Sequence, residues 1–446
     1  MPSDKFSKIG FILSIVGAAI GLGNAWKFPY MVGSNGGSAF VLLYLVFAVV
    51  VGLSIFFAEM AMGKISNADP VNAFRILAPR HSNLWSFAGV MMITGVFVAS
   101  FYTLIIGWVI KYAVASLGTL PVKISQSGEN FNNFISTDIL GQVFYFSIAF
   151  FAYFFILSRG VKRGIERINL WLLPMFSLLL VAMLVYSMQM KGFGEAVKFL
   201  LVFDFSKLTS EAVFMALGLA FFTMCVGIGA IITYSTSLDS KTNLFTSSLY
   251  VVILNIVFSI VIGLIVFTFV FEFGEKPSQG VGLAFISLPT LFAKLGGIGN
   301  LLSFAFFTAL VFAGLTSAIS MVEPLIFHIV KEYKISRFKA ILIVGICVYV
   351  LGVLCALSNT NMFKESLTFF GKGFFDILDY ISSNILLPLG GIVIAVFVGF
   401  FMKKEMLEEL FLPYMGKIVF KIWYFLLRYV APTCVVLVMI RQIVGQ

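Results

Sequence analysis

Apolar runs of about 20 residues or more recur along the whole chain, and each is long enough to cross the hydrocarbon core of a bilayer. Of the 446 residues, 60% are hydrophobic and only 11% are charged, and the charges fall mostly between the runs. A soluble chain of this length would form two or three domains of roughly 100–200 residues with charged surfaces. The pattern therefore predicts an all-α membrane protein with many spans.

Charges and clusters of Gly, Pro or Asn mark the ends of eleven predicted helices. These are expected near residues 9–33, 39–63, 87–116, 140–158, 168–190, 211–238, 244–272, 299–330, 340–357, 374–401 and 422–441. The first run contains glycines, ends in Lys27-Phe28-Pro29 and has no cleavage-site pattern. We interpret it as a retained span rather than a signal peptide.

The distribution of basic residues predicts the orientation of the chain. An odd number of spans puts the two termini on opposite sides of the membrane. The loops on the amino-terminal side carry eighteen lysines and arginines, and the opposite loops carry nine. The positive-inside rule then predicts a multi-pass protein of the cell inner membrane, with a cytoplasmic amino terminus and an outer carboxyl terminus. The net charge of +10 fits contact with anionic lipid head groups, and no basic domain suggests nucleic-acid binding.

Two of the predicted spans carry glycine clusters that disfavour a continuous helix. The first contains three glycines within residues 17–24, and the sixth contains Gly218, Gly227 and Gly229. A single Gly-x-Gly more often serves close helix packing. Recurrence at the start of two sets of five spans instead predicts an inverted five-plus-five repeat. The repeats would cover residues 1–190 and 211–401, and residues 402–446 would hold a cytoplasmic segment and the eleventh helix.

A binding site is expected between the two breaks. Unwound backbone at mid-membrane is tolerated where it lines a cavity or is buried in protein. Its free carbonyl oxygens suit a hard cation, and the N–H end of a half-helix suits a carboxylate.

Several motifs resemble those of the neurotransmitter:sodium symporters, in particular the bacterial amino-acid transporters of that family. They are Gly21-Leu22-Gly23-Asn24-Ala25-Trp26-Lys27-Phe28-Pro29-Tyr30, Asn35-Gly36-Gly37, Glu59-Met60-Ala61-Met62-Gly63, Gly227-Ile228-Gly229-Ala230 with Tyr234, and Ala313-Gly314-Leu315-Thr316-Ser317. Together they are specific, and they extend nearly from end to end. The resemblance implies sodium-coupled symport by alternating access, in a chain that has eleven helices instead of the family's usual twelve.

The resemblance also implies two sodium sites. The first would use the Ala19 carbonyl, Asn24, Thr223 and Asn255, together with the carboxylate of the bound amino acid. The second would use the carbonyls of Gly17, Ile20 and Ala313 and the hydroxyls of Thr316 and Ser317. The residues themselves agree, because two adjacent hydroxyls in an apolar span need partners. The alternative is that both hydroxyls bond to helix carbonyls one turn earlier.

For the substrate, the resemblance assigns the carboxylate to Leu22, Gly23 and Tyr102. The side-chain pocket would be formed by Val98, Ile105, Phe222, Cys225, Ile228, Ser317 and Met321. Without the flanking motifs, plain helix packing would explain these residues equally well. Glycine at position 21 replaces the aspartate with which monoamine carriers pair an amine. We therefore expect a neutral, apolar amino acid.

Charged residues near the expected site are assigned in the same way. Lys27 and Asp379 match the pair that closes the outer gate, with Asp376 as a competing partner. Lysine in place of arginine loses bidentate geometry, so the pair should be looser. Glu59 lies deep in a span, where a charged residue costs about 2.5–3.5 kcal/mol, and we expect it to bond to backbone exposed at a helix break. Glu323, just before Pro324, raises the same question, and contact with water is the alternative because it lies nearer the cytoplasmic end.

On the cytoplasmic side the resemblance fails in part. Pro2 and Lys5 replace the family's usual arginine and tryptophan, and Lys331 stands where an acidic partner is expected. A salt bridge of the usual polarity cannot form between such positions. No inner gate is assigned from the sequence.

Chloride dependence is a further expectation, on grounds of charge balance around the sodium sites, and Cl⁻ would then be a cofactor. Ser259 stands where chloride-independent bacterial relatives carry a carboxylate. Tyr44, Thr223 and Asn255 match the other anion-contacting positions or their neighbours. Leu219 replaces the family's glutamine donor, which argues the other way. The alternative is that Glu59 or a proton balances the charge.

The sequence bears on three other classes of function. A channel would need a continuous polar path, which no span suggests. An enzyme would need a nucleophile with a base or a metal cluster, but the only histidines, His81 and His328, have no such partners nearby in sequence. The four cysteines have neither metal-like nor disulfide-like spacing. A transporter-like amino-acid sensor without net flux stays open, as do the oligomeric state and the identity of the amino acid.

Overall fold

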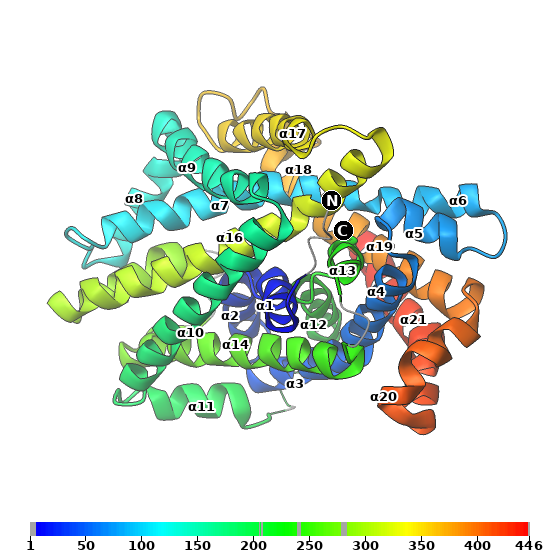
Figure 1. Ribbon diagram of the computed structural model, residues 1–446. Coiled ribbons are helices and arrows are strands. Elements are labelled where there is room, and N and C mark those ends of the chain that lie inside the picture. The colour runs from blue at the N-terminus through cyan, green and yellow to red at the C-terminus, as the bar shows by residue number, and fades with distance from the viewer. Residues whose placement is uncertain (1–5, 205, 207, 239–241, 278–282, 445–446) are drawn as a thin grey trace.

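The computed structural model describes residues 6–444, except 205, 207, 239–241 and 278–282, and it is built almost entirely of helices (Figure 1). The first repeat and the connection after it contain α1 (Lys8–Ala19), η1 (Gly23–Lys27), α2 (Phe28–Ser34), α3 (Ser38–Phe47), η2 (Ala48–Gly52), α4 (Leu53–Ser66), α5 (Pro70–Leu77), α6 (Ser82–Ser86), η3 (Phe87–Met92), α7 (Ile93–Ala115), α8 (Ile124–Ser136), α9 (Ile139–Ser158), η4 (Val161–Glu166), α10 (Arg167–Ser187) and α11 (Phe193–Leu201). The remainder contains α12 (Ser210–Thr223), α13 (Ala230–Ser235), α14 (Leu244–Glu272), η6 (Leu283–Ser287), α15 (Leu288–Ala293), α16 (Gly297–Tyr333), α17 (Arg337–Ser358), β1 (Thr368–Phe369), β2 (Lys372–Gly373), α18 (Phe374–Tyr380), η7 (Ile381–Leu386), α19 (Leu387–Val396), η8 (Phe397–Phe401), α20 (Lys404–Phe425), η9 (Leu426–Val430) and α21 (Ala431–Val444). The two strands form a small antiparallel hairpin in the loop before α18.

The helices reproduce the predicted spans. Among the described residues, nine helices are long and apolar enough to cross a bilayer, and α1 with η1 and α2 makes a tenth as one bent span. The pair α12 and α13 supplies the eleventh, which is too interrupted to count as a single helix. The predicted eleven-span pattern therefore fits, and the ends of most helices lie within a few residues of the expected ones.

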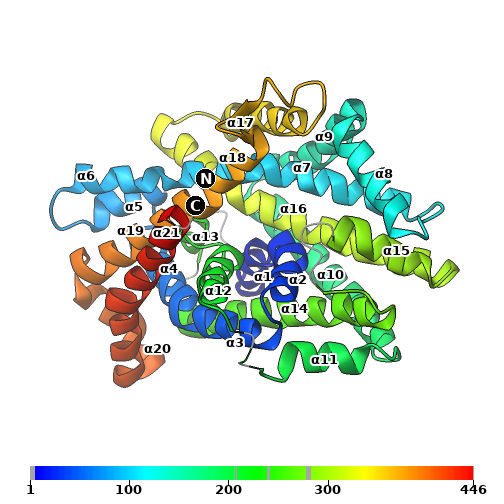
Figure 2. The ribbon, with the colours of Figure 1, turned by 180° about the vertical axis from the view of Figure 1, so that it is seen from behind.

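Both predicted breaks are present. Helix α1 ends at Ala19, and the next helical segment starts near Gly23 at an angle of 47°. Between α12 and α13, Cys225, Gly227 and Gly229 have φ values of 54°, 93° and 75°. Left-handed backbone of this kind favours glycine and ends a regular helix. In both views α1 and α12 lie near the centre of the molecule, with α3, α7, α14 and α16 around them (Figures 1 and 2).

Small residues allow the surrounding helices to approach closely, as is usual in membranes. A Cβ atom at Gly95 of α7 would touch the backbone carbonyl of Met321 in α16, and one at Gly63 of α4 would touch the carbonyl of Ile232 in α13. Because these contacts fix α4, α7 and α16 around the two breaks, they define the space between the broken helices.

The carboxyl-terminal part differs in detail from the predicted one. Residues 402–421 are expected as a cytoplasmic segment before a helix at 422–441, but α20 already begins at Lys404. Its only non-helical residue is Gly416, with φ 71° and ψ 161°, which marks a kink between two helical pieces. The apolar stretch continues through η9 into α21. The segment is thus helical before the kink, which its charges at residues 403–409 did not indicate.

Candidate functional site

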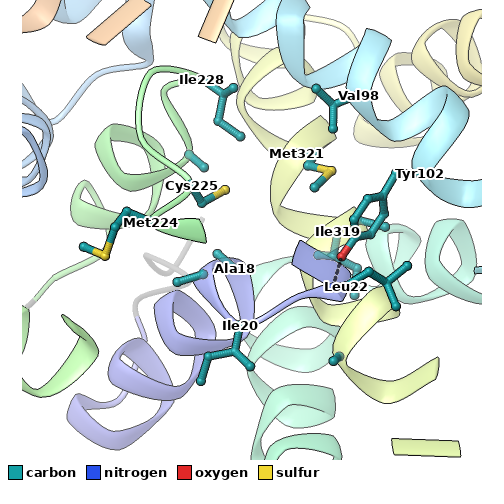
Figure 3. Packing of buried hydrophobic residues seen from close by; sticks show 14 of the residues in the cluster. Ala18, Ile20, Leu22, Val98, Tyr102, Met224, Cys225, Ile228, Ile319 and Met321 are labelled. Carbon is teal, nitrogen blue, oxygen red and sulfur yellow. Dashed lines mark hydrogen bonds between the residues drawn. The ribbon is translucent and has the colours of Figure 1, made fainter. Parts of the chain in front are cut away.

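A cavity lies at the two breaks and is lined by α1, η1, α7, α12, α16 and α19. Its walls are formed by Ala18, Ala19, Gly21, Gly23, Asn24, Val98, Tyr102, Phe222, Thr223, Cys225, Ile228, Ser317, Met321 and Leu387. Figure 3 shows Val98, Cys225, Ile228 and Met321 gathered around this space, with Tyr102 reaching the break in the first helix. None of these lining side chains is charged. The cavity therefore suits a ligand with an apolar body.

The structure brings most of the predicted substrate residues to this cavity. Leu22 and Ile105 are the exceptions, because they line a second cavity on the other side of Tyr102 and Phe222. Leu387, at the start of α19, contributes to the wall but was not anticipated. No local pattern could have identified it, since its role depends on how α19 packs against the break before α13.

Tyr102 ties α7 to the break in the first span. Its hydroxyl accepts a hydrogen bond of 2.8 Å from the backbone N–H of Leu22 and also interacts with the Ser317 hydroxyl. A Cβ atom at Gly21 would touch the Tyr102 hydroxyl and would lie 2.5 Å from Ser317 Oγ. Glycine at position 21 is therefore required for these two hydroxyls to meet the first helix.

The residues predicted for the second sodium site lie together between α1 and α16. Ser317 Oγ donates to the carbonyl of Gly17 at 2.9 Å and approaches that of Ile20 at 3.4 Å. Thr316 Oγ1 donates to the Ala313 carbonyl at 3.0 Å. All five residues are buried. A concentration of carbonyl and hydroxyl oxygens with no fixed positive charge is a donor set that fits a small hard cation.

The residues predicted for the first sodium site and for chloride form one buried polar cluster. Asn24 Nδ2 donates to Asn255 Oδ1 at 2.7 Å and to Ser259 Oγ at 2.8 Å. Tyr44 Oη lies 3.1 Å from Thr223 Oγ1 and 3.2 Å from Ser259 Oγ. Thr223 and Asn24 also line the central cavity, as does Ala19. The cluster thus connects the cavity to α3 and α14 through side chains that are all neutral.

A second cavity lies beyond Tyr102 and Phe222, and both Lys27 and Asp379 line it. The structure shows no ion pair within 4.0 Å between these two described residues. Lys27 Nζ instead lies 4.2 Å from the ring centroid of Phe222, and Asp379 Oδ1 accepts from Ser383 at 2.7 Å. The outer gate of Lys27 and Asp379 stays a prediction.

Glu59 lies where a buried carboxylate was expected to lie. Its Oε1 accepts a 2.6 Å hydrogen bond from the backbone N–H of Gly227, in the break between α12 and α13. The side chain is fully buried in α4. Glu59 therefore connects α4 directly to the broken backbone that lines the cavity.

Of the two alternatives for Glu323, contact with water is wrong. Its side chain does not reach water, because it is fully buried and forms a two-point ion pair with Arg337 at the start of α17. Arg337 also donates to the carbonyl of Leu157 at 2.9 Å. The sequence does not indicate this pair, because the turn between α16 and α17 brings Arg337 back beside Glu323.

An aromatic contact lies at the same end of the molecule as the Glu323–Arg337 pair. Phe6 packs edge-on against Tyr234 with ring centroids 5.5 Å apart, and the Tyr234 hydroxyl lies 2.9 Å from Ser320 Oγ. Pro2 and Lys5, which were weighed for an inner gate, lie outside the described residues.

Two interrupted helices that face each other across a largely apolar cavity, with carbonyl and hydroxyl oxygens at the breaks, define the architecture of an alternating-access secondary transporter. The family model described as "Sodium:neurotransmitter symporter family" matches residues 4–140 and 136–446. The chain belongs to this family of sodium-dependent transporters, and the resemblance drawn from its motifs is confirmed.

Individual proteins support the assignment along the whole chain. An uncharacterized sodium-dependent transporter of Bacillus subtilis, YhdH, is 36% identical over 99% of this chain and 98% of its own length. An uncharacterized sodium-dependent transporter of Haemophilus influenzae is 31% identical over 98% of this chain and 97% of its own length. The crystal structure of MhsT in complex with L-phenylalanine superposes with a TM-score of 0.88 and 34% identity, over 97% of this chain and 98% of that one. The predicted all-α fold with eleven spans is thereby confirmed.

Proposed function

We propose that this transporter is a symporter that couples the sodium gradient to the uptake of a neutral, apolar amino acid. The observation that carries the proposal is the central cavity, where uncharged apolar walls meet both helix breaks and the hydroxyls of Tyr102 and Ser317. We place the protein in the cell inner membrane with its amino terminus in the cytoplasm, on the basis of the loop charges.

The two half-helices of the first span have opposite electrostatic ends at the cavity. Helix α1 ends at Ala19, so the carbonyl oxygens of its last turn point toward the break. This negative end favours cations. The next segment begins near Gly23, where the positive amino end favours an anion. A zwitterionic amino acid can place its carboxylate at the Gly23 end, beside the Tyr102 hydroxyl and a sodium ion.

The substrate side chain would occupy the apolar part of the cavity. Val98, Ile228 and Met321 supply a wall without hydrogen-bonding groups, which leaves a charged side chain without partners. Gly21 offers no carboxylate to an amine that lacks its own carboxyl group. The solved relative MhsT holds L-phenylalanine, which supports an apolar amino acid as the substrate class.

Tyr102 and Phe222 would form the outer lid. Both side chains line the central cavity and the outer cavity, so they separate the two. Lys27, at 4.2 Å from the Phe222 ring centroid, holds this ring by a cation–π contact. Opening would require Phe222 to move away from the first helix, together with the rocking of one repeat against the other.

We also propose that chloride is a cofactor of this transport. Two sodium ions next to neutral side chains need a compensating negative charge. The Tyr44 hydroxyl lies 3.1 Å from Thr223 Oγ1 and 3.2 Å from Ser259 Oγ, and Ser259 Oγ also accepts from Asn24. Hydroxyl and amide groups of this kind can turn their donors toward an anion.

A thermal-shift screen tests the proposal most directly, because a ligand that binds only the folded state raises its stability. Purified protein should be stabilised by a few apolar amino acids in sodium chloride, and not in potassium or choline chloride. Uptake of the selected amino acid into proteoliposomes then separates a carrier from a sensor. Equal stabilisation in all three salts would contradict the coupling, and binding without uptake would favour the sensor.

A further inference from the structure

Helix α1 presents a face of small residues toward η4 and α10. Ser7, Gly10, Ser14 and Gly17 are spaced by three, four and three residues, so they share one side of the helix. The side chains opposite are Glu166 and Asn169, which are themselves three residues apart. This contact runs from the predicted second sodium site to the amino-terminal end of α1, and Figure 1 shows α10 passing close to α1.

The two glycines leave space for these polar side chains. A Cβ atom at Gly10 would overlap with Glu166 Oε1, and one at Gly17 would lie 2.9 Å from Asn169 Oδ1. The carboxylate and the amide oxygen therefore lie directly against the backbone of α1. A larger residue at position 10 or 17 would fill the space that the Glu166 and Asn169 side chains occupy.

Each of the two opposing side chains keeps one oxygen without a partner. Glu166 Oε2 and Asn169 Oδ1 are both buried and have no hydrogen-bond partner in the structure. Glu166 is 5% exposed and Asn169 is 0% exposed. Buried acceptors are nearly always satisfied, so each of these two oxygens requires a partner, either a water molecule or a cation.

The partners of these side chains orient the two oxygens. Asn169 Nδ2 donates to Ser14 Oγ at 3.3 Å, which points Oδ1 toward Gly17. The Gly17 carbonyl accepts a hydrogen bond from Ser317. A Cβ atom built on Gly17 would lie 3.1 Å from Thr316 Cβ. Asn169 Oδ1 therefore borders the predicted second sodium site. Glu166 Oε1 accepts from both the N–H and the hydroxyl of Ser7, which is exposed. Glu166 therefore marks the other end of this contact, buried beneath the exposed Ser7.

We propose that Asn169 and Glu166 form a cation-binding column, which extends the second sodium site toward the amino-terminal end of α1. The inference rests on the proposed sodium coupling. Asn169 supplies an amide oxygen beside the five residues already predicted, and Glu166 supplies the carboxylate among the described residues of this contact. Oxygen donors of these two kinds suit an alkali cation. Ser14 positions the Asn169 amide, and Ser7 competes with the cation for the Glu166 carboxylate.

The test measures sodium binding without substrate and without transport. The melting temperature of purified protein is followed as sodium chloride replaces choline chloride at constant ionic strength. The midpoint sodium concentration is compared for wild type, Asn169→Leu, Asn169→Asp, Glu166→Gln, Ser7→Ala and the control Ser187→Ala. Ser187 also lies in α10, but it donates to the carbonyl of Met183 and is away from the column.

We expect Asn169→Leu to raise the sodium midpoint about tenfold, and Asn169→Asp to lower it, because the aspartate adds a negative charge beside the site. Glu166→Gln should raise it about threefold. Ser7→Ala should leave it unchanged or lower it, because the carboxylate loses competing donors and keeps its charge. Ser187→Ala should match wild type.

The opposite results would overturn the proposal. If Asn169→Leu and Asn169→Asp both leave the midpoint unchanged, Asn169 is no ligand, and a buried water satisfies its oxygen. If Glu166→Gln and Ser7→Ala shift the midpoint in the same direction, their hydrogen bonds only dock α1 against η4. If wild type shows no stabilisation specific to sodium, the proposed function itself fails. The melting temperature in choline chloride shows whether each variant is folded.

Discussion

Arg337 binds both carboxylate oxygens of Glu323, with distances of 2.8 Å from Nη1 to Oε1 and 2.6 Å from Nη2 to Oε2. Glu323 has no exposed surface, whereas the Arg337 side chain is 24% exposed. The pair joins α16, which carries the predicted second sodium ligands, to the first turn of α17. It therefore fixes the end of the molecule that we place in the cytoplasm.

Removal of Arg337 should destabilise the fold strongly. Arg337→Met leaves the Glu323 carboxylate buried without its counter-ion, and the loss of one partner of such a pair costs about 3–5 kcal/mol. We expect a clear fall in the melting temperature in detergent. The double variant Glu323→Gln with Arg337→Met should recover much of this loss, because no charge is then buried. Equal melting temperatures for the single and double variants would contradict this account.

This ion pair also shows what the sequence could and could not indicate. Spans and breaks depend on local features, namely apolar length and glycine clusters, so both were predictable. The partner of Glu323 depends on the turn between α16 and α17, and that of Ser7 lies 159 residues away at Glu166. The family motifs, and not residue spacing, predicted that Asn24, Asn255 and Ser259 belong to one region. Neither the motifs nor the spacing indicated that Leu387 lines the central cavity.

Glu59 should matter more as an acceptor than as a charge. Glu59→Gln keeps an oxygen that can accept from the Gly227 N–H, whereas Glu59→Leu leaves this buried donor without a partner, at a cost of about 1–3 kcal/mol. We therefore expect Glu59→Leu to lower both the melting temperature and sodium-dependent substrate binding, and Glu59→Gln to lower them much less. The two quantities are measured side by side in detergent. A glutamine variant as defective as the leucine variant would show that the charge itself is needed.

A single methyl group at position 21 should block the substrate site. In Gly21→Ala the added Cβ atom would touch the Tyr102 hydroxyl and lie 2.5 Å from Ser317 Oγ, so both hydroxyls must move. We expect substrate affinity to fall more than tenfold, with a melting temperature near that of wild type. Gly194→Ala in α11 is the matched control, since a Cβ atom there meets nothing within 4 Å. Unchanged affinity in Gly21→Ala would place the substrate elsewhere.

Stability at low pH should depend on Asp69, which lies outside the spans. It caps α5 through the N–H groups of Val71 and Asn72, and its Oδ1 lies 2.7 Å from His328 Nδ1. Burial raises the pKa of Asp69, but the hydrogen bonds from His328 and Asn72 outweigh burial and leave this pKa below its usual value. A lowered folded-state pKa means that the ionised carboxylate stabilises the fold above the unfolded-state pKa, at about 3.9.

That stabilisation is lost as the pH falls through the folded-state pKa of Asp69. The fall in stability therefore occurs mainly below about pH 4. Asp69→Asn keeps a side chain that caps helices well but cannot ionise. We expect the melting temperature of wild type to fall more steeply than that of Asp69→Asn between pH 5 and pH 3, the window that brackets about pH 4. Parallel profiles would show that other groups control the acid response.

Chloride dependence tests the charge balance of the central site. The hydroxyls of Tyr44, Thr223 and Ser259 meet beside Asn24, and no carboxylate belongs to this cluster of described residues. We expect sodium-driven uptake into proteoliposomes to require chloride, and to fall at least tenfold when gluconate replaces it. Ser259→Glu should remove the requirement, because the introduced carboxylate supplies the negative charge in place of the anion.

Leu219 provides the complementary test, because the family's usual glutamine would add an amide donor there. A hydrogen bond to a charged group contributes about 1.5–3 kcal/mol, so Leu219→Gln should lower the chloride concentration for half-maximal uptake about tenfold or more. Wild-type uptake that is equal in chloride and gluconate would reject the anion site. A chloride requirement that survives Ser259→Glu would place the anion away from residue 259, and the hydroxyl cluster would then only join α3, α12 and α14.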